Sequence, residues 1–138
     1  MTLVPWAGEY IGLPFAERGR TREGVDCWGL VRIVLSERYG VDVPSYAERY
    51  ECCGDVEILG NLVPAEAREW LYVPIENATA GDVIVLRMRG RAMHVGIIVG
   101  DGKFLHAREK IGSCLEDYRG PMWAPRVVEV RRHPRMPA

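Results

Sequence analysis

The chain has 138 residues, of which 48% are hydrophobic and 27% are charged. This length and composition predict one globular domain over residues 1–138, with a core of its own. The formal net charge is −1, which excludes the strongly basic surface typical of nucleic-acid-binding domains, so we expect no nucleic-acid partner. No apolar run approaches the ~18 residues that a membrane span requires.

Residues 1–11 lack the basic start and the apolar core of a secretory signal peptide. We therefore expect synthesis in the cytoplasm, with a separate carrier needed for any action outside it. The four cysteines form no disulfide framework, because Cys52 and Cys53 are adjacent while Cys27 and Cys114 are isolated. They also lack zinc-ligand spacing, so we predict no metal. We also predict that the protein uses no cofactor and is a monomer in isolation.

Two short helices and a loop are predicted around one longer helix in the first half of the chain. Residues 2–10 fit a short helix, and residues 16–26 (AERGRTREGVD) are polar and contain glycine, which favours a loop. Residues 64–70 (PAEAREW) fit a second short helix, with proline in its first turn. The stretch 45–63, which contains the adjacent cysteines, is interpreted as one wall of a cleft.

The longer helix is predicted over residues 27–39. Its apolar side chains recur at helical spacing, while polar side chains fill the other face. Asp26 is a suitable N-cap, because its carboxylate can accept a hydrogen bond from an unpaired N–H of the first turn. Gly40 can end the helix in a left-handed conformation.

Four short segments rich in Val, Ile and Leu follow in the second half, at residues 82–88, 94–99, 103–107 and 126–131. Asp101-Gly102 suits the positive φ angles of a type I′ turn, so the second and third segments should form a hairpin. Helices followed by an antiparallel meander predict an α+β fold. The Arg-rich end of the chain is interpreted as a solvated tail, with contact to an anionic surface or a partner protein as the alternative.

Cys27 lies at the predicted N-terminus of the longer helix. Unpaired backbone N–H groups and the helix dipole favour an anion there, and they lower the pKa of a thiol from its usual ~8.5. The thiolate is the reactive form, so Cys27 is a candidate nucleophile. The alternative is a small buried core cysteine.

A nucleophilic thiol needs a base, and the chain has three histidines. His133 falls in the proline-rich tail, whereas His94 and His106 lie on the two strands of the predicted hairpin. Pairing across the turn places His106 opposite residue 97, and a bulge would change which face it occupies. Whether the two share a face stays open; the alternative roles are a satisfied strand-end histidine for His94 and an exposed cross-strand histidine for His106.

Four segments occur in a fixed order along the chain: GLPF at 12–15, GVDCWGLV at 24–31, AGDVIVL at 80–86 and HVGIIVGDGKFLHA at 94–107. Together they resemble the NlpC/P60 cell-wall peptidases, which are papain-like cysteine peptidases. The resemblance implies N-terminal helices packed on an antiparallel β-sheet. It also implies Cys27 as nucleophile, His94 as general base and His106 as the third residue, which orients His94.

The substrate class of this family is the peptide stem of peptidoglycan. The resemblance implies hydrolysis between D-Glu and a diamino acid, most often diaminopimelate. The Asp-Cys-Trp-Gly-Leu-Val variant is most similar to the branch found in phage tails, prophages and gene-transfer agents. This implies a tail-tip hydrolase with tail proteins as partners, which a phage-like particle carries to the cell wall.

Three residues near the thiol are expected at the substrate-binding edge: Phe15, Asp26 and Trp28. Phe15 stands where the family often has a tyrosine whose hydroxyl helps at the oxyanion site, and Tyr10 or Tyr46 are candidates to replace that hydroxyl. Trp28 replaces the family's usual serine and should reshape the pocket.

Two other functions fit the same sequence. A weakly active or inactive structural tail-tip protein is favoured by Phe15, Trp28 and the basic tail. An acyltransferase or amidase on the same fold would keep the Cys27 nucleophile and act on a different amide, so the identity of the product would separate it from a peptidase.

Overall fold

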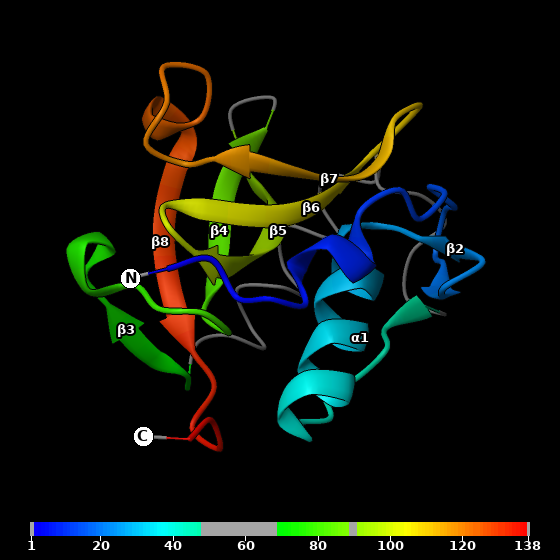
Figure 1. Cartoon of the computed structure of the whole chain (residues 1–138), viewed down its shortest axis with the longest axis horizontal. Coiled ribbons are helices and arrows are strands. Elements are labelled where there is room, and N and C mark those ends of the chain that lie inside the picture. Colours follow the sequence, from blue (N-terminus) through cyan, green and yellow to red (C-terminus); the bar gives the residue numbers. More distant parts are fainter. Residues whose placement is uncertain (1, 48–68, 89–90, 138) are drawn as a thin grey trace.

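The computed structural model describes residues 2–47, 69–88 and 91–137 (Figure 1). With η marking a 3-10 helix, the elements are η1 (Ala7–Tyr10), β1 (Arg20–Thr21), β2 (Gly24–Val25), α1 (Cys27–Tyr39), β3 (Leu71–Val73), η3 (Ile75–Asn77), β4 (Val83–Met88), β5 (Arg91–Gly100), β6 (Lys103–Arg108), β7 (Gly112–Asp117), η4 (Ala124–Arg126) and β8 (Val127–Arg132). Six strands form an antiparallel sheet in the order β3-β8-β4-β5-β6-β7. The predicted α+β class is confirmed.

Helix α1 has the predicted bounds. The Asp26 carboxylate accepts a hydrogen bond from the Gly29 N–H at 2.8 Å, which confirms the N-cap. Gly40 ends the helix with φ 65°, a left-handed conformation that glycine adopts without steric cost. The helix packs on β5 and β6, so its N-terminal residue is carried toward the two strands that hold the histidines.

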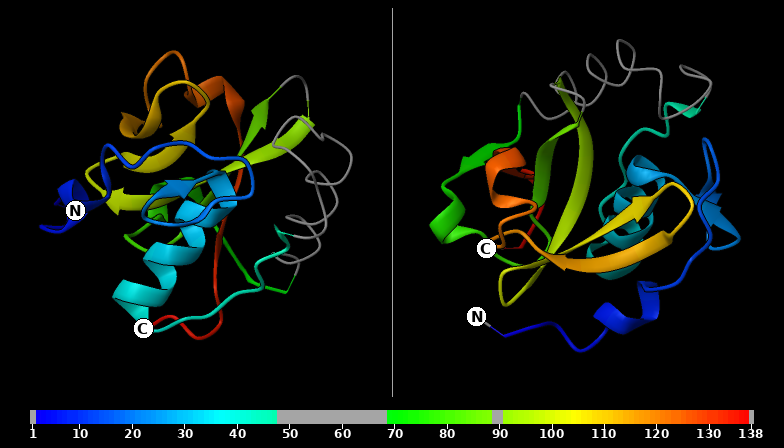
Figure 2. Two further views of the ribbon diagram at one scale, coloured as in Figure 1. Left: turned by 90° about the vertical axis from the view of Figure 1, so that its right-hand side faces the viewer. Right: turned by 90° about the horizontal axis from the view of Figure 1, so that it is seen from above.

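The sheet is covered on both faces, and each face has its own apolar cluster. Figure 2 shows α1 on one side of the sheet and the short turns η3 and η4 on the other. The cluster on the helix side includes Leu30, Val34, Val85, Val95, Ile97 and Leu105. The cluster on the other side includes Val73, Ile84, Leu86, Ile98, Phe104 and Trp123. Alternate residues of β5 therefore serve different clusters, as a strand that is buried on both faces requires.

The β5–β6 hairpin is confirmed, and it contains a bulge. Asp101 and Gly102 both have positive φ, at 52° and 68°, as a type I′ turn demands. Gly100 pairs with Lys103, but the register then shifts by one residue, so that Ile97 pairs with Leu105. This shift sets which residue of β5 lies opposite each later residue of β6.

Several local predictions in the first half are wrong. Residues 2–10 form no α-helix, only the single 3-10 turn η1. Residues 16–26 are not all loop, because Arg20 pairs with Val25 in the small β1–β2 ladder. Strands β3 and β7 were not predicted. The predicted helix at 64–70 and the predicted cleft wall at 45–63 lie mostly outside the described residues.

The Arg-rich end is also more structured than a solvated tail. Arg131 and Arg132 belong to β8, where Arg131 pairs with Glu129 and Arg132 pairs with the buried Asp82. The two cations are attached to the sheet by these contacts. The interpretation as a solvated end is therefore wrong for Arg131 and Arg132, whereas Arg126 is exposed.

Candidate active site

Cys27 is the first residue of α1 and is buried. Beneath it, the Asp26 carboxylate accepts from the Gly29 N–H and from the Arg20 guanidinium, each at 2.8 Å. Arg20 also donates to the Ser45 carbonyl at 2.7 Å, which ties β1 and the segment after α1 to the start of the helix. Contacts with β1 and with the segment after α1 thus fix the helix N-terminus, which favours an anion at Cys27.

Asp26 was expected at the substrate-binding edge, and the structure corrects this. Its side chain has no exposed surface, and its Oδ1 is occupied by the cap and by the ion pair with Arg20. A substrate cannot reach a carboxylate in that position. Asp26 positions Cys27 from below and contacts no solvent.

Trp28 is likewise not at an open edge. It is only 2% exposed, its Nε1–H donates to the Pro44 carbonyl at 2.7 Å, and its ring lies 6.1 Å from that of Tyr46. The ring packs against its neighbours, and its expected contact with substrate stays a prediction. Trp28 fixes the chain around Pro44 and Tyr46 against the start of α1.

Phe15 lies against β2, the strand that leads into Cys27, and its expected contact with substrate stays a prediction. It is half-buried and forms an isolated bridge with Val25, two residues before Cys27. Backbone hydrogen bonds on either side, from Val25 N–H to the Pro14 carbonyl and from Ala16 N–H to the Val25 carbonyl, fix it there. Its aromatic ring supplies no hydroxyl to the site.

Tyr10 cannot replace the missing hydroxyl. Its hydroxyl donates to Glu37 at 2.7 Å and accepts from Arg38 at 3.0 Å. Glu37 lies ten residues beyond Cys27, which is roughly 15 Å along the helix axis. Tyr46, which packs beside Trp28, is the remaining candidate.

The structure brings His94 and His106 together. Nε2 of His94 lies 2.8 Å from Nδ1 of His106, within hydrogen-bonding distance. The register that pairs Ile97 with Leu105 sets His106 opposite Gly96, and Gly96 shares a face with His94. The bulge therefore answers the question that the sequence left open, and both imidazoles lie on one face.

Aromatic rings enclose the imidazole pair. His106 has no exposed surface, and His94 is 9% exposed. The Trp123 ring stacks on His94 with centroids 6.2 Å apart and meets His106 edge-on at 4.8 Å, while Phe104 lies 4.5 Å from His106. Burial and then the neighbouring His94 lower the pKa of His106 to about 3, so His106 is neutral at pH 7. The alternative of an exposed cross-strand His106 is wrong.

Glu116 on β7 is a site residue that the sequence analysis missed. Its Oε2 lies 2.6 Å from Nε2 of His106 and 3.6 Å from the Arg108 guanidinium. Partial burial would raise the pKa of this carboxyl, but the neighbouring donors of Trp123 and His106 and the charge of Arg108 outweigh burial and hold the pKa below its usual value. The alternation Cys114–Glu116 was the available signal, and it has meaning only once β7 is known to pair with β6.

One group of side chains has the composition of a metal site. Ligand atoms of His106, Cys114 and Glu116 all lie within 4.8 Å of one another. The His106–Glu116 hydrogen bond already uses two of these atoms, and the Arg108 cation stands beside the carboxylate. Burial, followed by the Glu116 charge, raises the pKa of Cys114 to about 11, which disfavours the thiolate that a metal requires. The group suits a hydrogen-bonded chain better than a metal.

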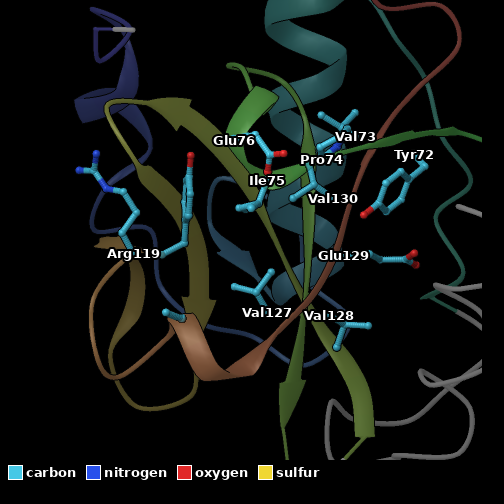
Figure 3. A pocket seen from close by; sticks show the side chains of 12 residues that line it. Tyr72, Val73, Pro74, Ile75, Glu76, Arg119, Val127, Val128, Glu129 and Val130 are labelled. Atoms are coloured by element: carbon cyan, nitrogen blue, oxygen red, sulfur yellow. The ribbon is translucent and has the colours of Figure 1, made fainter.

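A pocket of about 540 Å³ lies elsewhere on the molecule (Figure 3). Its lining comes mainly from β3, η3 and β8, and Tyr118 and Arg119 also contribute. Neither Cys27 nor the two histidines line it. It is therefore separate from the candidate active site.

The model of the NlpC/P60 family matches residues 12–132, which are most of the chain. This chain belongs to the NlpC/P60 family. A crystal structure of an NlpC/P60 protein from Bacillus cereus has a TM-score of 0.70 at 22% identity and covers 94% of this chain and 38% of that one. The similarity confirms the predicted NlpC-type, papain-like fold.

Two curated relatives are similar to most of this chain. The murein DD-endopeptidase MepS/murein LD-carboxypeptidase of Escherichia coli K12 is 28% identical over 125 residues, covering 90% of this chain and 57% of the relative. A protein of Haemophilus influenzae named as a probable endopeptidase is 31% identical over 126 residues, covering 90% of this chain and 68% of the relative. This chain therefore spans little more than half the length of the Escherichia coli protein. Within the part of the chain that the structure describes, no helix is both long and apolar enough to cross a membrane.

Proposed function

We propose that the chain is a cysteine peptidase that hydrolyses the peptide stems of peptidoglycan. The observation that carries the proposal is the 2.8 Å contact between His94 and His106, formed on the strands against which α1 and its N-terminal Cys27 pack. Cys27 belongs to the same apolar cluster as Val95 of β5 and Ala107 of β6, so it packs with the two strands that carry the histidines. The names of the relatives in Escherichia coli and Haemophilus influenzae support the endopeptidase class.

The proposed reaction uses three residues of this chain. His94 takes the proton of the Cys27 thiol, and the thiolate sulfur attacks the carbonyl carbon of the scissile amide. The backbone N–H groups at the start of α1 stabilise the tetrahedral oxyanion. His94 then returns the proton to the leaving amine, and water, activated by His94, hydrolyses the thioester. His106 holds His94 in position throughout, as the third member of a triad does.

For the scissile bond, we propose the amide between D-Glu and diaminopimelate. The support is the resemblance of the four sequence segments described above to their counterparts in the family. The Escherichia coli relative is named for DD-endopeptidase and LD-carboxypeptidase activities, so those bonds are the competing outcomes. A transferase or amidase would be recognised by products that carry a new acyl acceptor or that retain the full stem peptide.

We also propose that a phage-like tail carries the protein to the cell wall. The support is the Asp-Cys-Trp-Gly-Leu-Val segment, in which Trp28 is buried and holds the chain at Pro44. Mass spectrometry of tail-like particles purified from the producing cells is expected to detect this chain in stoichiometric amount. Its absence from intact particles would contradict the proposal.

The activity is tested with purified Gram-negative sacculi, incubated with the protein or with Cys27→Ala, followed by mass spectrometry of the released fragments. We expect new fragments cut after D-Glu, and a loss of at least about 10³-fold in their rate of release with the variant. Equal release by both folded proteins would overturn the role of Cys27. Fragments cut at a DD or LD bond would overturn only the proposed position of the cut.

A further inference from the structure

Three side chains form a continuous hydrogen-bonded line through the buried part of the site. His94 Nε2 lies 2.8 Å from His106 Nδ1, and His106 Nε2 lies 2.6 Å from Glu116 Oε2. They come from three neighbouring strands, β5, β6 and β7. His106 pairs directly with Cys114 across β6 and β7, so Glu116, two residues further on, lies on the same face. We infer that Glu116 is a positioning residue that fixes the proton positions of both histidines and leaves Nδ1 of His94 as the base toward Cys27.

The proton positions follow from donor and acceptor counting. Glu116 is ionised at pH 7 and can only accept a hydrogen bond, so the proton of the neutral His106 sits on Nε2. His106 Nδ1 is then an acceptor, and His94 must donate to it from Nε2. A neutral His94 with its proton on Nε2 has an unprotonated Nδ1. Each contact in the line thus sets the orientation of the next.

The hydrogen-bonded residues His94, His106 and Glu116 also interact electrostatically. When His94 takes the thiol proton it becomes a cation, and the carboxylate behind His106 stabilises that cation in a site from which water is largely excluded. The charged and titratable groups that face Glu116 are His106 and Arg108 of β6 and Cys114 of its own strand β7. Arg108, at 3.6 Å, opposes part of the effect, and the Cys114 thiol is 3.8 Å away and neutral.

Trp123 adds a second observation at the same carboxylate. Among the described residues, its Nε1 is the buried side-chain polar atom that has no hydrogen-bond partner in acceptable geometry. The indole contributes to the low pKa of Glu116, so it lies close enough to act on that charge. An indole N–H can only donate a hydrogen bond, so a partly buried carboxylate is a favourable neighbour for it.

The inference rests on the proposed function for its catalytic meaning, but its first test does not depend on activity. Nitrogen-15 NMR of the histidine side chains reports which ring nitrogen carries the proton. We expect the Nε2–H form for His106 in the native protein, and a mixture of tautomers in Glu116→Gln, since an amide can either accept or donate. Asp117→Asn is the matched control, because Asp117 is the next residue of β7 and pairs instead with Lys103 and Arg119.

A second readout is the pH dependence of Cys27 alkylation by iodoacetamide. We expect Glu116→Gln to slow alkylation at pH 6.5 about tenfold, because loss of the carboxylate destabilises the His94 cation that accompanies the thiolate. Glu116→Asp should restore part of the rate, and Asp117→Asn should leave it unchanged.

A native His106 protonated on Nδ1, or a folded Glu116→Gln protein with unchanged tautomers and alkylation, would overturn the inference. Failure of the native protein to cut sacculi, with the expected tautomers present, would count against the proposed function and leave the role of Glu116 in orienting the histidines supported.

Discussion

Asp26 supports the nucleophile without contacting substrate. Its carboxylate caps α1 through Gly29 and pairs with Arg20; the Asp26 side chain is fully buried and that of Arg20 is 11% exposed. A buried ion pair adds little net stability, but loss of one partner leaves an uncompensated charge. The cap and the ion pair of Asp26 therefore help to fix the start of the helix, where Cys27 lies.

We expect Asp26→Ala to lower the free energy of unfolding by at least about 2 kcal/mol, since it removes both the helix cap and the carboxylate of a largely buried ion pair. Asp26→Asn should lose less, because its oxygen can still cap the helix. Urea denaturation of both variants checks this. As a control, Glu9→Gln breaks a surface pair with Arg38 and should have little effect on stability. Equal losses in Asp26→Ala and Glu9→Gln would contradict this role.

At this scale, local patterns were predictable and distant partners were not. The Asp26 cap involves a residue three positions away, so the sequence predicts it correctly. The partner of Tyr10 lies 27 residues away and the partner of His106 lies on a strand that was not predicted. Tyr10 was therefore proposed for the wrong site, and Glu116 was not proposed for any.

Among the elements, the bulge in the β5–β6 hairpin has the largest consequence for the site. It moves His106 from a position opposite residue 97 to one opposite Gly96. The absence of a side chain at Gly96 leaves the space through which His106 approaches His94. A Cβ there would lie 2.7 Å from the Leu105 carbonyl oxygen and 3.3 Å from the His106 Cβ.

Gly96→Ala should therefore push β6 away and separate the two histidines. We expect a loss of about 1–3 kcal/mol in stability, as for other overpacked interiors, and a larger proportional loss of peptidase activity. Thermal unfolding and the sacculus assay measure the two effects on the same samples. Gly8→Ala is a suitable control, because nothing lies within 4 Å of the added Cβ. Full activity in Gly96→Ala would show that the close approach is dispensable.

The elements that were predicted correctly carry strong local signals. Helix α1 has helical apolar spacing and residues that define both ends, and the hairpin has Asp101-Gly102 at its turn. Strand β7 (GSCLED) has a single large apolar residue, Leu115, and its pairing with β6 makes it a strand. Tertiary contacts of this kind leave little trace in the sequence.

For the whole molecule, the buried imidazole of His106 makes the free energy of unfolding depend on pH in the acid range. His106 titrates near its usual pKa of ~6.5 when the chain is unfolded, and at about 3 when folded. Between these values the unfolded state binds more protons, so stability falls as the pH falls. Glu116 acts in the same direction at lower pH, because its folded pKa is depressed below 4.5 and its stabilising contribution is lost on protonation.

We expect the unfolding free energy to decrease steadily from pH 6.5 to pH 4, and we expect a shallower slope in His106→Gln, which has no titrating group at that position. Urea titrations at fixed ionic strength give both slopes. A slope that the substitution leaves unchanged would mean that other groups dominate the acid response.

The fold class was accessible from the order of the elements, helix first and meander second, and the papain-like fold from the four family segments. The sequence did not predict that both faces of the sheet are buried, each by its own apolar cluster. This arrangement places Trp123 and Phe104 around the histidines, although both are distant from Cys27 in the chain.

A rate measurement on the thiol itself decides whether Cys27 and His94 act as one unit. Iodoacetamide alkylation is followed from pH 5 to 9, with each cysteine resolved by peptide mass spectrometry. Cys114 serves as the slow internal reference, because its pKa is raised to about 11. We expect Cys27 to react well below pH 8.5, and at least about tenfold faster at pH 6.5 than in His94→Ala. An unchanged profile with a midpoint near 8.5 in both proteins would show that Cys27 is an ordinary buried thiol and that the proposed peptidase site is wrong.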